Sequence, residues 1–174
     1  MKRCFVMALA AACASTCALQ AQAANPNPLS AEVKRAYTQV KSNLLKAAEN
    51  MPEENYSFKP TPDVRTFGQI IAHVADAQTR MCSAVQGQPK SGSAASRTSK
   101  ADLVAALQAS IADCDAAYDS LTDATISQMI NLGRAQRSKL GVLVGNTTHA
   151  NETYGYLAVY LRLKGLVPPS SEGR

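Results

Sequence analysis

The chain offers few residues that could do chemistry. Its 174 residues include 2 histidines and 5 cysteines, and they contain no Walker-type GxxxxGKS/T, GxGxxG, GxSxG or HExxH motif. Each of these motifs supplies a phosphate cradle, a catalytic serine or a zinc site. Nucleotide-binding enzymes of those types, serine hydrolases and zincin proteases are therefore not expected. Any metal site would have to be built around His73 and His149.

Each histidine lies on a segment with the 3.6-residue periodicity of a helix. Asp76 follows His73 at i+3 and Glu152 follows His149 at i+3, so each imidazole has a carboxylate beside it. Two histidines from different helices that face one cavity are a common metal site in helical bundles. Asp76 and Glu152 could complete such a site or could orient the imidazoles from outside it. The alternative is that both histidines are hydrogen-bonded core residues.

Four helices must position these side chains. The spacing of apolar residues predicts them over residues 31–50, 67–86, 100–120 and 138–164. Ser30 is expected to cap the first helix, and Thr66 with Gln69 forms a capping-box pattern at the second. No segment alternates long enough to form a sheet, although residues 128–132 could be a short extended piece. The predicted class is all-α, most simply a four-helix bundle.

The N-terminus has the features of a secretory signal over residues 1–23. A basic pair at positions 2 and 3 precedes an Ala-rich apolar run, and Ala21 and Ala23 supply the small residues that a signal peptidase needs. The apolar run is too short to span a bilayer comfortably. We therefore expect cleavage after Ala23, a domain over residues 24–174 without a membrane anchor, and a periplasmic or secreted location.

Cleavage lowers the basic character of the chain. The intact chain has 18 Lys+Arg and 13 Asp+Glu, a formal net charge of +5, and removal of Lys2 and Arg3 leaves +3. The remaining cations are scattered in loose groups, so a solvated surface is the simpler interpretation. Together with the expected export, this distribution argues against a nucleic acid partner.

The cysteines that remain after cleavage are Cys82 and Cys114, and an oxidising compartment favours a disulfide between them. Two separate buried thiols are the alternative. The cysteines lie 15 and 14 positions after the expected starts of their helices. In antiparallel helices they would be about 15 Å apart along the axis, whereas a disulfide needs Cα atoms within about 7 Å. A disulfide therefore predicts parallel second and third helices, an up-down-down-up bundle and a crossover linker over residues 87–99.

Four stretches of sequence carry a resemblance to a known family. They are MPEENYSFKPTP at 51–62, RTFGQIIAHVAD at 65–76, HANETYG at 149–155 and YLRLKGLVPP at 160–169. In this order and at these separations, they resemble the DinB-like superfamily of four-helix-bundle proteins. The resemblance covers nearly all of residues 24–174 and implies the same bundle, with parallel second and third helices.

The resemblance also implies a site. Members of that family typically carry three histidines around a divalent metal such as zinc or nickel, one on the second helix and an HxxxH pair on the last. His73 and His149 match two of these positions, and Thr153 stands at the third. A threonine hydroxyl is a poor ligand beside imidazole. Either Asp76, Glu152, Thr153 or water completes a weakened site, or metal binding has been lost.

Two functions follow from these alternatives. Similar proteins with three histidines include metal-dependent thiol S-transferases and isomerases, which suggests a metal-dependent transferase or hydrolase acting on a small molecule. The metal would there lower the pKa of a bound thiol or water. The other function is a non-catalytic exported module that binds a small ligand or packs against another chain, which leaves a homodimer open. Export counts against a thiol transferase, because cytosolic thiol cofactors are scarce outside the cytoplasm.

Overall fold

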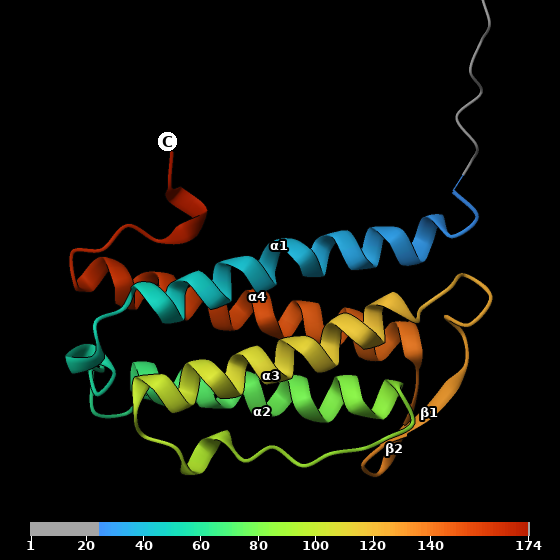
Figure 1. The fold of residues 1–174 in the computed structure, drawn as a ribbon, viewed down its shortest axis with the longest axis horizontal. Coiled ribbons are helices and arrows are strands. Elements are labelled where there is room, and N and C mark those ends of the chain that lie inside the picture. The colour runs from blue at the N-terminus through green and yellow to red at the C-terminus, as the bar shows by residue number, and fades with distance from the viewer. Residues whose placement is uncertain (1–24, 174) are drawn as a thin grey trace, which may run out of the picture.

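Four long helices make up most of the chain, namely α1 (Pro28–Asn50), α2 (Phe67–Val85), α3 (Lys100–Asp119) and α4 (Lys139–Leu163). The structure is a computed structural model that describes residues 25–173, so the predicted signal sequence lies outside the described residues. The helices lie side by side as a bundle (Figure 1), which confirms the predicted class. None of the helices in this part of the chain is long and apolar enough to cross a bilayer.

Short polar side chains fix where three of the helices begin. The Thr66 hydroxyl accepts a hydrogen bond from the backbone N–H of Gln69, and the Gln69 side chain accepts one from the backbone N–H of Thr66. This is the predicted capping box, which satisfies two N–H groups that have no partner within the helix. Ser99 and Ser138 cap α3 and α4 with their hydroxyl oxygens.

The predicted cap of the first helix is wrong. α1 begins at Pro28, two residues before Ser30, and its N-cap residue Asn27 makes no capping hydrogen bond with its side chain. Proline is favoured at the first helical position because its φ is already helical and it has no N–H to leave unpaired. Ser30 lies inside the first turn, where its hydroxyl donates to Asp123 Oδ1 at 2.9 Å. This bond ties α1 to the segment that follows α3.

A β-hairpin that the sequence pattern did not predict lies between α3 and α4. β1 (Met129–Leu132) pairs antiparallel with β2 (Ala135–Ser138). The two-residue turn begins at Gly133 with φ +63°, and Arg134 has a negative φ, which is the pattern of a type II′ turn. The expectation that no sheet forms was wrong because each strand has only 4 residues, too few for alternation to stand out.

α2 and α3 run in the same direction. Gly68 near the start of α2 lies against Leu103 near the start of α3. Near the other ends of the two helices, Cys82 and Cys114 form the predicted disulfide, with their Cα atoms 4.8 Å apart. α1 and α4 run in the opposite direction, so the four helices follow an up-down-down-up order (Figure 1).

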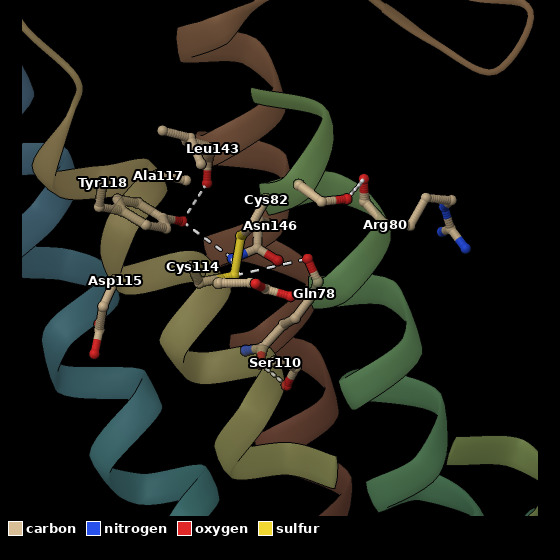
Figure 2. The surroundings of a disulfide bond; sticks show 12 residues. Gln78, Arg80, Cys82, Ser110, Cys114, Asp115, Ala117, Tyr118, Leu143 and Asn146 are labelled. Atoms are coloured by element: carbon tan, nitrogen blue, oxygen red, sulfur yellow. Dashed lines mark hydrogen bonds between the residues drawn. A yellow bond between two sulfur atoms is a disulfide. The ribbon is translucent and has the colours of Figure 1, made fainter. Parts of the chain in front are cut away.

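A buried polar network surrounds the disulfide (Figure 2). Asn146 of α4 donates from Nδ2 to Tyr118 Oη at 3.2 Å and to Cys114 Sγ at 3.7 Å. The Tyr118 hydroxyl in turn donates to the carbonyl oxygen of Leu143 at 2.7 Å. The Tyr118 ring stacks on Tyr37 of α1 with ring centroids 4.1 Å apart. The network therefore joins α1, α3 and α4 at the level of the disulfide.

The connection between α2 and α3 returns along the bundle beside these two helices (Figure 1). It contains one short 3-10 turn, η2 (Ala94–Ser96), where the sequence predicted no regular structure. Asp76 holds this turn, because its two carboxylate oxygens accept the backbone N–H groups of Ala94 at 2.7 Å and Ala95 at 3.1 Å. A Cβ at Gly92 would clash with the Asp76 carboxylate. Glycine at this position therefore lets the linker pass close over α2.

Candidate functional site

The structure brings the two predicted histidines together. His73 comes from α2 and His149 from α4, and their Nε2 atoms are 3.0 Å apart, which is hydrogen-bonding distance. The rings meet edge to face, with centroids 4.9 Å apart and planes at 67°. Both side chains are partly buried.

The surroundings of His149 indicate which imidazole donates. A neutral imidazole has one N–H and one lone pair, so one ring must donate and the other accept. His149 Nδ1 is buried and has no hydrogen-bond partner among the described residues. If His73 donated, His149 would carry a buried N–H without an acceptor, which is costly. We therefore assign the Nε2–H to His149 and the accepting lone pair to His73 Nε2.

Both imidazoles are expected to be neutral at pH 7. Burial lowers the pKa of His73, and the guanidinium groups of Arg65 and Arg80 lower it further against a smaller opposing effect of nearby carboxylates. Burial is also the main cause that lowers the pKa of His149, and the neighbouring His73 adds to it. The short contact between the two Nε2 atoms excludes a pair in which both rings are protonated, because each Nε2 would then carry an N–H and two imidazolium rings would repel each other.

The structure gives other partners to each side chain that was predicted as a third ligand. The Thr153 hydroxyl donates to the backbone carbonyl of His149 at 2.7 Å. Asp76 accepts the two N–H groups of the linker turn. Glu152 Oε1 accepts from the Tyr156 hydroxyl at 2.7 Å on the exposed side of α4. Within residues 25–173, no group of three or more His, Cys, Asp or Glu side chains could hold a metal ion.

The two histidines alone do not fit the three-ligand metal centre of the family. Their spacing is compatible with a metal, because two nitrogens each about 2.0–2.1 Å from one ion lie about 2.8–3.4 Å apart. However, a metal-bound histidine almost always donates its other N–H to an acceptor, and His149 Nδ1 has none in the described part of the chain. A site of two imidazoles without this support would hold a metal weakly.

A cavity of about 490 Å³ opens beside His73 along α2. Arg65, Gln69 and Arg80 line it from α2 and the residues before it, and Arg97 lines it from the linker. The sequence places Arg80 on the same helical face as His73, because it follows His73 at i+7. No local signal placed Arg65 or Arg97 near the histidines, and the cations were expected to be scattered over the surface.

The fold agrees with comparisons to known proteins. The model of the DinB superfamily matches residues 36–157. A DinB-like protein from Bacillus cereus is similar in structure, with a TM-score of 0.68 and 18% identity over 79% of this chain and 93% of its own. A DinB-like protein from Bacillus subtilis has a TM-score of 0.65 and 15% identity over 82% of this chain and 99% of its own.

A conserved protein from Enterococcus faecalis has a TM-score of 0.63 and 15% identity over 78% of this chain and 96% of its own. No curated protein matches the chain at a significant level. At these identities, the solved structures support the fold alone. The family model covers well over half of the sequence, and the chain therefore belongs to the DinB superfamily.

Proposed function

We propose that this DinB-superfamily chain is a non-catalytic, exported module that binds a small molecule beside His73 and does not hold a metal through three side chains. One observation carries the proposal. The Nε2 atoms of His73 and His149 are 3.0 Å apart and can satisfy each other, while the family's third ligand position is taken by Thr153, whose hydroxyl bonds to the backbone. The cavity beside His73 supplies the space for a ligand.

The nearby carboxylates support the proposal because neither can turn to the histidines without loss. Asp76 would have to release the N–H groups of Ala94 and Ala95. Hydrogen bonds to a charged group each contribute about 1.5–3 kcal/mol, so this movement would also loosen the linker turn on α2. Glu152 would have to leave the Tyr156 hydroxyl and reach inward from an exposed position.

A second function is favoured by the spacing of the histidines. The distance of 3.0 Å between the two Nε2 atoms also suits two ligands of one divalent ion. The chain would then be a metal-dependent transferase or hydrolase for a small molecule, with zinc or nickel held by two imidazoles and completed by water or ligand. We rank this function second because Nδ1 of His149 has no hydrogen-bond partner among residues 25–173.

Metal analysis of the exported protein distinguishes the two functions. We expect the purified wild type to contain no stoichiometric zinc or nickel and to keep its melting temperature when a chelator is added. The matched variant is Thr153→His, which restores the third histidine and should acquire stoichiometric metal together with a chelator-sensitive melting temperature. Stoichiometric metal in the wild type that is lost in His73→Ala and His149→Ala would overturn the proposal. Far-UV circular dichroism of each variant confirms that it is folded.

The exported location is part of the proposal and has its own test. It rests on the signal-like residues 1–23 and on the disulfide between Cys82 and Cys114, because disulfides persist mainly in oxidising compartments. The mature protein should be recovered outside the cytoplasm with its N-terminus at Ala24. Recovery of uncut protein in the cytoplasm, with both thiols free, would contradict this location.

A further inference from the structure

We infer that the ligand of the cavity beside His73 is a small organic dianion, carrying carboxylate or phosphate groups that bind to Arg65 and Arg80. This inference rests on the proposed function, because it names the chemical class that the same pocket would take. It starts from the positive charge that lines the cavity and from the fact that the protein itself does little to neutralise it.

The cavity has more positive than negative side chains. Three arginines, Arg65, Arg80 and Arg97, line it together with one carboxylate, that of Asp76. Both oxygens of Asp76 already accept backbone N–H groups, so this carboxylate is turned to the linker. His73 adds no charge at neutral pH, because burial and the two neighbouring guanidinium groups lower its pKa. The wall of the cavity is therefore electropositive.

The guanidinium groups of Arg65 and Arg80 have no partners in the described part of the chain. Neither donates a side-chain hydrogen bond or forms an ion pair within residues 25–173, although five other basic side chains do form ion pairs there. Arg97 pairs with Asp102 only at 4.0 Å on the surface, an arrangement that contributes little. A guanidinium group presents a fork of donors that suits carboxylate and phosphate. Two guanidinium groups beside one cavity are thus available to bind an anionic ligand.

The shape of the cavity favours a ligand with two anionic groups. Gln69 and Arg80 both line it, and they are eleven positions apart on α2, which corresponds to about 16 Å along the helix axis. Arg65 precedes the helix at the Gln69 end, and Arg80 lies at the other end. The small side chains of Ala72 and Ala77 line the cavity between them and leave room for a chain of carbon atoms. A monoanion could engage one guanidinium group, whereas an elongated dianion could engage both.

A titration of defined anions tests the inference. We would measure binding of linear dicarboxylates from malonate to dodecanedioate, of the matching monocarboxylates and of inorganic phosphate to the folded mature protein, by calorimetry with chelator present. One dicarboxylate length should bind best and clearly better than its monocarboxylate. Arg65→Gln and Arg80→Gln should each weaken this binding about tenfold or more, as loss of a charge-assisted hydrogen bond predicts. Preference for phosphate over every dicarboxylate would assign the phosphate class.

The control variant is Arg35→Gln, which removes an exposed guanidinium group from α1, away from the cavity. It should leave the affinity unchanged. Equal weakening in Arg35→Gln and Arg80→Gln would show binding to the overall charge and would overturn the inference, as would the absence of binding by every anion. Neither result bears on the metal content, so failure of this inference is distinguishable from failure of the proposed function. Stoichiometric metal in the wild type would reject the proposed function whatever the anions do.

Discussion

Polar side chains lie between the helices in two neighbouring regions, one around the Cys82–Cys114 disulfide and one around the His73–His149 pair. In the disulfide region, Asn146 and Tyr118 bond to groups of the protein itself and are buried. In the histidine region, the imidazoles bond to each other, and Arg65 and Arg80 beside them have no side-chain partner within residues 25–173. In the first region, polar side chains form hydrogen bonds that hold the helices together. In the second region, polar side chains at a cavity remain available to bind a ligand.

This difference predicts which property of the protein a substitution in each region will change. Removing a polar group from the disulfide region should lower the free energy of unfolding, because its partners would be left buried and unpaired. Removing a charge from the cavity should change ligand binding and leave folding nearly unchanged. The following experiments test this prediction from the largest expected effect to the smallest.

The largest effect should follow loss of the disulfide. Cys82 and Cys114 are 32 residues apart in sequence, and the chain-entropy model assigns about 3–4 kcal/mol to a loop of this size. Denaturant unfolding of the double variant Cys82→Ala/Cys114→Ala should show this decrease in the free energy of unfolding. Adding a reductant to the double variant serves as the control, because it should cause no further change. A decrease below 1 kcal/mol would contradict the structural role.

The next effect concerns the tyrosine hydroxyl beside the disulfide. Tyr118→Phe removes the hydroxyl that bonds to the Leu143 carbonyl and to Thr147 and leaves these groups buried. We expect a loss of about 1–3 kcal/mol in the free energy of unfolding. Tyr156→Phe is the matched control, because that hydroxyl bonds to Glu152 on the surface and should contribute less than about 0.5 kcal/mol. Similar values for the two variants would remove the contrast between buried and exposed hydroxyls.

A smaller effect should appear in the dependence of stability on pH. Both histidines have a pKa below the ordinary value of 6.5, mainly because of burial. Between the lowered pKa and 6.5, the unfolded chain binds more protons than the folded one, so stability is full above pH 6.5 and falls as pH falls. The loss should stay below about 1 kcal/mol per histidine, because both groups are partly exposed and screened by water.

Thermal unfolding between pH 7.5 and pH 5.5 measures this dependence in wild type and in His73→Gln/His149→Gln. The slope of stability against pH should be shallower in the double variant, since the shifted histidines are gone while the carboxylates remain. An unchanged slope would show that the histidines titrate normally. Stability that rises on acidification would mean that the folded protein favours a protonated histidine, in conflict with the lowered pKa of both imidazoles.

The smallest effect on folding should come from the cavity arginines. Arg65→Gln and Arg80→Gln remove positive charges that have no ion-pair partner in the described residues. We expect the free energy of unfolding to change by less than about 0.5 kcal/mol, toward greater stability, because repulsion among the arginines is reduced. Denaturant unfolding without ligand is the measurement. A large loss of stability would place these arginines with the structural side chains.

Several features were predictable because the relevant signal is local or strictly geometric. The capping box at Thr66 requires residues three positions apart, and the sequence displays them directly. The parallel direction of α2 and α3 followed from the positions of Cys82 and Cys114 along their helices, because a disulfide tolerates only a narrow range of Cα–Cα distances. The pairing of His73 with His149 combined helical periodicity with the family resemblance.

Other features depended on contacts between distant segments and could not be predicted. Asp76 was expected near the imidazoles, and its i+3 spacing gave no sign that the linker turn would supply two N–H donors to it. The hairpin after α3 is formed by strands too short to show a period. The cavity needs Arg97 of the linker beside Arg80 of α2, which only the crossover brings together.

The crossover linker has a consequence for how the pocket could change. One wall of the cavity is linker, including Arg97, and this segment is held on α2 by the hydrogen bonds that Asp76 and Ser83 accept from its backbone N–H groups. Substitutions in the linker can therefore alter the shape and charge of the cavity without disturbing the packing of the four helices. The exposed positions of this segment could therefore be exchanged to change ligand preference, provided that Asp76, Ser83, Gly92 and the buried Ala94 are kept.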